Sequence, residues 1–368
     1  MRIALVAGPW LPVPPPAYGG TEGVIDRLAT GFRDAGHEVL LYTTGDSTCS
    51  VPKAWVRERA VPEYIGQSYV EVHHLLHAYD EVADYDIIHD HTIVGPVIAE
   101  SRAKGRVVTT NHGPFTNELN EIYARAGRHA EVVAISHDQA SRASEPVSAV
   151  IHHGLRPEEW TVGQGEGDYL LFLGRFSPDK GAREAALVAH LSGVPLIMAA
   201  KMREREEIEY FKDQVEPLLD SHVQYVGEVG MVEKQKLLGS ARALLNPILW
   251  PEPFGLVMTE ALACGTPVLT LRSGAAPEIV EHGVTGSSST GSRSWPRPST
   301  GSTSSTARRA GGRSRATSPP TAWCASTSTS SSGSWPRSPI TVEPITGPRR
   351  PGQGNHPARV VRTPPTRP

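Results

Sequence analysis

Short apolar runs alternate with stretches of helical pattern along the first 286 residues of this 368-residue chain. The short runs predict buried strands, and their alternation with helices is typical of α/β domains with parallel sheets. The strands predicted in the first half are Ile3–Ala7, Glu38–Tyr42, Ile87–His89, Val107–Thr110 and Val132–Ile135. Those predicted in the second half are Tyr169–Gly174, Pro195–Ala199, Val223–Val226, Ala243–Asn246 and Val268–Leu271.

The two series of strands predict two α/β domains, and the chain is long enough for each to have its own core. We expect a first domain over residues 1–160, a linker rich in glycine and acid over 161–168, and a second domain over 169–286. Such domains bind ligands at the carboxyl ends of their strands. The economical architecture is therefore two Rossmann-like domains that face a cleft.

The composition changes abruptly after Gly286. Residues 287–368 contain no Leu, Phe, Tyr, Met or Lys and are dominated by Ser, Arg, Pro, Thr and Gly. A segment of this kind cannot bury a core, so it predicts a disordered, low-complexity tail. With suitable synonymous codons, a one-base shift turns the codons of 287–290 into Phe-Val-Val-Asp and those of 295–300 and 325–337 into helical sequences. We interpret the tail as frameshifted and the second domain as incomplete.

Charge and cysteine content narrow the class of protein. The tail holds 12 of the 36 basic residues and one of the 39 acidic ones, so the remainder has 24 basic against 38 acidic groups. This acidic body argues against a nucleic-acid partner. The three cysteines share no metal or redox spacing, which suits a reducing cytoplasm. We find no signal peptide and no apolar run of membrane-spanning length, and we expect a cytoplasmic protein.

The loop after the first strand contains a proline run and then Gly19-Gly20, before a helix predicted over Thr21–Ala35. It lacks the G-x-G-x-x-G pattern, which disfavours a nicotinamide-dependent oxidoreductase. The two glycines let the backbone approach a ligand closely at a helix start, although an ordinary turn before a helix has the same composition.

Two basic residues follow the first strand of the second half, Arg175 and Lys180. At the carboxyl end of a strand both can converge on a diphosphate, Arg as a fixed fork and Lys as a mobile charge. Isolated surface Arg and Lys side chains are more often simply solvated, so the pair alone is a weak signal.

The segment Pro251–Glu260 places Glu252 in a proline-flanked loop and Glu260 eight positions later, inside a helix predicted over Leu256–Cys264. A helix N-terminus binds phosphate, and neighbouring carboxylates can hydrogen-bond sugar hydroxyls. The pattern therefore predicts a sugar-nucleotide site. Two glutamates at this spacing are common in proteins, so the pair by itself would be weak evidence.

Histidines cluster at predicted strand ends, in His89-Asp90-His91, at His112 and in His152-His153. A zinc site from His, Asp and His is conceivable, but adjacent residues at a strand end point to opposite faces. We favour hydrogen bonding or contact with an acceptor substrate. The D-x-D string at 84–86 lies at the N-terminal end of a strand, away from the expected cleft, and we interpret it as a solvated loop. No metal site is predicted.

The block from Ala243 to Leu269, the string from Gly174 to Gly181 and the glycine loop together resemble the retaining family 4 glycosyltransferases (glycosyl transferases group 1), which have the GT-B fold. The resemblance covers roughly residues 1–286. It implies transfer of a hexosyl group from a UDP- or GDP-sugar, without metal or other cofactor, to a glycan, lipid-linked or small-molecule acceptor. A lipid-linked acceptor would imply peripheral contact with a membrane.

The resemblance also implies roles for single residues. Arg175 and Lys180 would contact the donor diphosphate, and Glu252 the hydroxyls of the donor sugar. The remaining donor contacts would be the glycine loop at Gly19 and Gly20, the base-contacting loop at Val229, the amides of Phe254, Gly255 and Leu256, and the ribose-binding Glu260. His112 resembles the histidine beside the reacting sugar, so the catalytic group would be Glu252, His112, Arg175 and Lys180.

Two other functions stay open on the sequence alone. A frameshift-damaged gene would give a non-catalytic product, and the same fold also serves sugar-nucleotide epimerases. The basic pair Arg175 and Lys180, followed by Glu252 and Glu260, favours transfer over epimerisation. The donor sugar, the base and the acceptor cannot be read from the chain.

Overall fold

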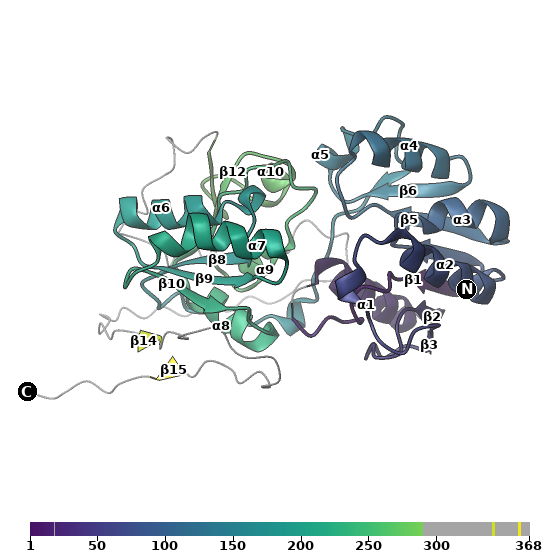
Figure 1. Cartoon of the computed structure of the whole chain (residues 1–368), viewed down its shortest axis with the longest axis horizontal. Coiled ribbons are helices and arrows are strands. Elements are labelled where there is room, and N and C mark those ends of the chain that lie inside the picture. Colours follow the sequence, from purple (N-terminus) through teal and green to yellow (C-terminus); the bar gives the residue numbers. More distant parts are fainter. Residues whose placement is uncertain (18, 290–340, 343–359, 362–368) are drawn as a thin grey trace, which may run out of the picture.

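The computed structural model describes residues 1–17, 19–289, 341–342 and 360–361, and its main body is two α/β domains (Figure 1). Each domain is built on one parallel sheet, with seven strands in the first and six in the second. The predicted architecture of two Rossmann-like domains is confirmed.

The first sheet has the strand order β3-β2-β1-β4-β5-β6-β7. Because the order reverses between β1 and β4, the loops after these strands diverge and leave a crevice at the carboxyl ends. The strands are β1 (Arg2–Val6), β2 (Glu38–Tyr42), β3 (Lys53–Ala54), β4 (Ile87–Asp90), β5 (Arg106–Thr110), β6 (Ala130–Ala134) and β7 (Ala149–Val150). The helices are α1 (Gly20–Asp34), η1 (Pro62–Tyr64), α2 (Ser68–Val82), α3 (Gly95–Arg102), α4 (Asn117–Ala126), α5 (His137–Ala140) and η2 (Pro157–Glu159).

The second sheet repeats this plan with the order β10-β9-β8-β11-β12-β13. Its strands are β8 (Leu170–Arg175), β9 (Leu196–Lys201), β10 (Val223–Gly227), β11 (Ala243–Asn246), β12 (Val268–Leu271) and β13 (Gly286–Ser289). Its helices are η3 (Pro178–Lys180), α6 (Ala182–Ser192), α7 (Arg205–Tyr210), the π-helical turn η4 (Phe211–Val215), η5 (Glu216–Leu218), α8 (Met231–Ser240), α9 (Leu256–Ala263) and α10 (Ala276–Ile279).

The central strands are buried on both faces, which explains why they read as nearly continuous apolar runs. In β8, for example, Leu171 packs into a cluster with α8 and α9, whereas its neighbour Phe172 packs into a cluster with α6. The predicted strands lie within two residues of the observed ones at either end, and the helix predicted over Thr21–Ala35 is α1.

The segment predicted as a linker, 161–168, instead lies against the second domain. The amides of Gly163, Gly165 and Gly167 donate to the carbonyls of Cys264, Gly239 and Ser240 at 2.9, 2.9 and 2.7 Å. A Cβ on Gly163 would stand 2.0 Å from the Gly239 oxygen. The glycines therefore serve close packing rather than flexibility. Trp160 already belongs to the core of the second domain, so the chain crosses between domains before the predicted boundary.

The structure also moves the start of the predicted tail. Ser287, Ser288 and Ser289 continue β13, which pairs in parallel with β12 at the edge of the second sheet. The domain therefore extends at least to Ser289, because the open edge of β12 accepts a partner strand whatever its side chains. The rest of the predicted tail and frameshift lies outside the described residues, apart from a two-stranded antiparallel pair of β14 (Thr341–Val342) and β15 (Val360–Val361).

Within the part of the chain that the structure describes, no helix combines the length and the apolar character needed to cross a membrane.

Candidate active site between the two domains

Gly255 is the N-cap residue of α9, and its φ of 91° lies in the left-handed region that disfavours side chains. A Cβ at this position would also stand 2.6 Å from Met258 Cε and 3.1 Å from Glu252 Oε2. Glycine is thus required for the loop to turn into the helix beside Glu252. The first amides of α9 have no partner within the helix, and they are available to an anion there.

Glu252 forms an ion pair with Lys180 Nζ, although the two residues are far apart in sequence. Both side chains are largely buried, with 13% of Glu252 and 15% of Lys180 exposed. Loss of either partner of such a pair would leave the other group buried without its counter-ion. The predicted diphosphate-binding lysine and the predicted sugar-binding glutamate are therefore in direct contact.

Arg175 lies at the end of β8, next to η3, which carries Lys180. Its guanidinium contacts Asp179 Oδ2 at 3.3 Å, and 41% of the side chain is exposed. Arg175 and Lys180 therefore belong to one loop at the carboxyl edge of the second sheet, as the sequence predicts.

Glu260 lies one helical turn further along α9 and pairs with Lys234 of α8 at 2.7 Å. Lys234 Nζ also lies 5.4 Å from the centroid of the Trp160 ring. Burial lowers the pKa of Arg27 on α1, and the charge of Glu260 opposes that effect. Lys234 and Arg27 were not predicted, because each faces Glu260 only through contacts between separate elements.

The glycine loop of the first domain touches α9 of the second. A Cβ on Gly20 would lie 3.2 Å from Leu256 Cδ1, and one on Gly19 would lie 2.6 Å from Pro15 Cβ. A side chain at either position would therefore displace the neighbouring residue. The predicted glycine loop of the first domain thus meets the start of α9 in the second at Leu256.

Val229 lies in the loop after β10 and packs, partly buried, against the apolar cluster of the second domain. The preceding residue Glu228 pairs with Arg203 at 2.8 Å. The loop therefore stands at the carboxyl edge of the second sheet, two strands away from Arg175 in the order β10-β9-β8.

Four histidines form a row at the carboxyl edge of the first sheet. The ring centroids of His89 and His91 lie 4.2 Å apart, those of His91 and His112 5.2 Å, and those of His112 and His153 5.2 Å. His91 Nδ1 and His112 Nε2 share a hydrogen bond of 2.9 Å. At its far end, His153 contacts the Phe254 ring at 5.0 Å, so the row leads to α9.

Burial lowers the pKa of every imidazole in this row. It lowers the pKa of His89 to about 4 and of His153 to about 3, and it holds the pKa values of His91 and His112 well below the ordinary range. The four rings are therefore neutral at neutral pH. Each can donate or accept one hydrogen bond without bringing a charge to the site.

Asp90 points away from this row, as expected for the neighbour of two residues on one face of a strand. Its carboxyl accepts from Tyr79 Oη and from the Thr92 hydroxyl and amide, each at 2.7 Å. Burial raises the pKa of Asp90 to about 6. The string His89-Asp90-His91 therefore does not converge on one point.

The D-x-D string at 84–86 lies at the opposite end of β4 from this row. Asp84 pairs with Lys104 at 2.8 Å, and Asp86 accepts from the Arg2 amide at 2.8 Å. Both carboxylates are therefore engaged in local contacts, and the predicted place of the string away from the cleft is confirmed.

The two domains also meet through Glu278 on α10, a contact that was not predicted. Its carboxylate accepts from the amides of His137 and Asp138 at 2.8 and 2.7 Å, and His152 Nε2 lies 2.8 Å from Oε2. Ser136 caps α5 at this point, accepting from the Gln139 amide at 3.0 Å. No sequence pattern links these positions, because the partners are more than 120 residues apart.

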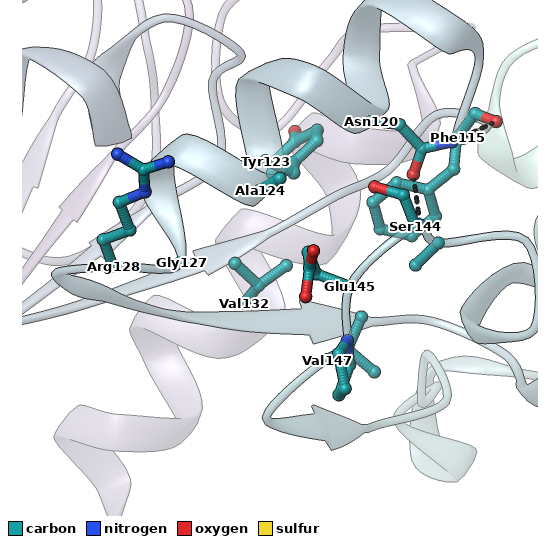
Figure 2. A pocket seen from close by; sticks show the side chains of 12 residues that line it. Phe115, Asn120, Tyr123, Ala124, Gly127, Arg128, Val132, Ser144, Glu145 and Val147 are labelled. Atoms are coloured by element: carbon teal, nitrogen blue, oxygen red, sulfur yellow. Dashed lines mark hydrogen bonds between the residues drawn. The ribbon is translucent and has the colours of Figure 1, made fainter.

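A separate cavity of 370 Å³ opens in the first domain, beside α4 and β6 (Figure 2). Its walls include Tyr123, Val132 and Phe115, with Arg128 and Glu145 at the rim. None of the predicted site residues lines it.

Two facing Rossmann-like domains with this strand order define a protein of the GT-B class. Profiles of two families match the chain, "Glycosyltransferase Family 4" over residues 18–159 and "Glycosyl transferases group 1" over residues 161–294. The chain belongs to the family 4, group 1 glycosyltransferases, and it is a glycosyltransferase.

Named relatives agree with this assignment. The phosphatidyl-myo-inositol mannosyltransferase of Mycolicibacterium smegmatis is 28% identical over 318 residues, which cover 78% of this chain and 80% of the relative. Among solved structures, AviGT4, a glycosyltransferase of avilamycin A biosynthesis, is 26% identical with a TM-score of 0.57, covering 84% of this chain and 91% of that one. Anabaena HepE in complex with UDP and glucose has a TM-score of 0.67 at 20% identity, with coverages of 86% and 95%.

Proposed function

We propose that this glycosyltransferase moves a hexosyl group from a UDP- or GDP-sugar to a glycan, lipid-linked or small-molecule acceptor, with retention of anomeric configuration and without a metal ion. The single observation that carries the proposal is the meeting of Lys180, Glu252 and the start of α9 with Gly20 of the other domain. The named relatives, which include a mannosyltransferase and a protein bound to UDP and glucose, support a nucleotide-sugar donor.

The donor diphosphate would lie between η3 and the N-terminus of α9. Lys180 and Arg175 supply positive charge there, and the free amides of Gly255 and Leu256 supply oriented donors. These groups stabilise the charge that builds on the leaving nucleoside diphosphate, which is the electrostatic task that a metal ion performs elsewhere.

The sugar and the ribose would be held by the two carboxylates. Glu252 accepts from donor-sugar hydroxyls, and Glu260 accepts from ribose hydroxyls one helical turn further on. The loop at Val229 would meet the base with its backbone, while Gly19, Gly20 and the Phe254 amide complete the donor contacts. Glu252, Gly255 and Glu260 follow one another along the loop and α9, so one extended donor would reach all three.

Transfer would occur on one face of the sugar. The bond from the anomeric carbon to the phosphate oxygen breaks, the acceptor hydroxyl bonds to the same face, and its proton passes to the departing phosphate. Neutral His112 would border the acceptor there, positioned by its hydrogen bond of 2.9 Å to His91. This route needs no separate catalytic base. A lipid-linked acceptor would bring the enzyme, acting from the cytoplasm, into peripheral contact with a membrane.

The proposal is tested by incubating the protein with UDP-glucose, UDP-galactose and GDP-mannose in excess chelator, without an acceptor. Slow release of UDP or GDP from one donor is expected, and NMR of the fresh sugar should show the anomer of the donor. Activity that requires added divalent ion would overturn metal independence, and the opposite anomer would overturn retention. Failure to bind or hydrolyse any donor would favour the non-catalytic alternative.

Glu260→Ala is expected to weaken binding of the nucleotide donor by more than about tenfold, because one charged hydrogen bond is lost. Titration calorimetry with UDP and GDP measures the loss. The matched control is Glu233→Ala on the neighbouring helix α8, where the ion pair with Lys236 is long, at 3.7 Å. Unchanged affinity in Glu260→Ala would remove this residue from the donor site.

A further inference from the structure

Three possible metal ligands meet at the boundary between the domains, outside the proposed donor site. A ring nitrogen of His137, one of His152 and a carboxylate oxygen of Glu278 all lie within 4.8 Å of one another. The two histidines belong to the first domain and the glutamate to the second. Among the residues that the structure describes, this is the one such group of three.

We propose that this cluster is a zinc site that ties the two domains together. Two imidazoles and one carboxylate form a ligand set that zinc takes with tetrahedral geometry, leaving a fourth position for water. Nitrogen-rich sets of this kind select zinc over magnesium or calcium, which prefer oxygen ligands.

The carboxylate is already oriented for this role. Its Oε1 accepts from the Asp138 amide at 2.7 Å and its Oε2 from the His137 amide at 2.8 Å, so Glu278 is fixed against the first domain. Metal-binding carboxylates are commonly held by such second hydrogen bonds. The neighbouring Asp138 side chain pairs with Arg142 at 2.8 Å and stays outside the cluster.

Only small movements would bring the ligands around one ion. Ligand atoms about 2.0–2.2 Å from a tetrahedral zinc lie roughly 3.3 Å from one another. His152 Nε2 and Glu278 Oε2, now 2.8 Å apart in a hydrogen bond, would open by about half an ångström, and the exposed His137 side chain would close in. Zinc would then lie between His152 Nε2 and Glu278 Oε2, in place of their hydrogen bond.

The position of the cluster gives the ion a consequence for the enzyme. The ring of His152 lies 5.9 Å from that of Phe254, the residue before the N-cap Gly255 of α9. An ion that joins His137 and His152 to Glu278 would hold α5 and α10 together at this edge of the cleft. Bound zinc would therefore resist separation of the domains and would slow any turnover step that requires it.

Titration calorimetry of the full chain with zinc chloride tests the proposal. One tight site per chain is expected, with affinity reduced at least tenfold in His137→Ala and in Glu278→Gln. Hydrogen exchange at the amides of residues 137 and 138 should slow on addition of zinc, because opening of the contact must then break metal bonds. Circular dichroism of each variant confirms that it is folded.

The matched control is His73→Ala. His73 and His77 lie on the exposed face of α2 with ring centroids 4.9 Å apart, the spacing at which a surface pair binds zinc adventitiously. The tight site should survive this substitution. Loss of zinc binding in His73→Ala but not in His137→Ala would overturn the proposal, as would the absence of tight binding or unchanged exchange at residues 137 and 138.

Discussion

Replacing Lys180 by methionine is expected to lower kcat/KM by about 10²–10³-fold, the usual cost of removing one group that stabilises developing negative charge. Methionine retains most of the length of lysine and removes the charge. Because the diphosphate gains charge as it leaves, most of the loss should fall on kcat rather than on the affinity for the donor. Steady-state kinetics with the donor identified in the hydrolysis assay measures this split.

The same substitution has a structural cost that must be separated from the catalytic one. Glu252 is 13% exposed, and without Lys180 its carboxylate would be buried with no counter-ion in this pair. Removing one partner of a buried pair destabilises a protein by about 3–5 kcal/mol. We therefore expect a lower midpoint of thermal unfolding for Lys180→Met.

The double variant Lys180→Met/Glu252→Gln separates the two effects. The glutamine side chain carries no charge, so much of the lost stability should return, whereas activity should stay low because both proposed donor contacts are altered. The matched control is Lys236→Met, a lysine that is 68% exposed and whose contact with Glu233 is long. If the double variant regained activity together with stability, Lys180 would be only a structural partner of Glu252.

The local features of this enzyme could be predicted from the sequence because each depends on neighbouring residues. The strands are buried on both faces and therefore appear as short apolar runs. The start of α9 is marked by Pro253, which fixes its own φ, and by Gly255, which permits the left-handed turn into the helix. Arg175 ends β8 and Lys180 lies in the loop that follows, so parallel-sheet geometry places both at the edge that binds ligands.

The contacts between elements could not be predicted in this way. Lys234 reaches Glu260 from another helix, and Glu278 reaches α5 from another domain. Such pairs depend on how two elements pack, and a single sequence carries no signal for that packing. The prediction of a linker over residues 161–168 was wrong for a related reason. A glycine-rich segment can be either a flexible linker or a closely packed strip of backbone. The sequence does not distinguish the two, whereas the Gly239 carbonyl against Gly163 shows that this segment is closely packed.

Restoring the shifted reading frame from residue 287 is expected to raise both stability and turnover. With the synonymous codons assumed for the frameshift interpretation, the shifted frame would place Phe-Val-Val, which are strong strand formers, where the chain has three serines. These positions form β13, paired through Leu269, Thr270 and Leu271 with β12. Apolar side chains here would pack against the sheet edge where the serine hydroxyls add little.

The single substitution Ser288→Val isolates the contribution of the strand in the chain as it stands. Ser288 is only 7% exposed. Full burial of a valine side chain stabilises a fold by about 1.5–3 kcal/mol relative to an exposed one. On an edge strand we expect about 1 kcal/mol of this in the free energy of unfolding. For a domain of this size that corresponds to a rise of about 2–4 °C in the midpoint of thermal unfolding.

The frame itself is settled by a fresh read of the gene across codons 280–300. If the fresh read does not contain the one-base shift, the repaired chain is the natural enzyme. We then expect it to unfold more than about 5 °C above the serine-containing chain, because several apolar side chains would lie at the sheet edge. If the read reproduces the serine codons, the natural protein has this weak edge strand. An unchanged unfolding temperature in both Ser288→Val and the repaired chain would contradict the frameshift interpretation, because a strand that belongs in the sheet must stabilise it.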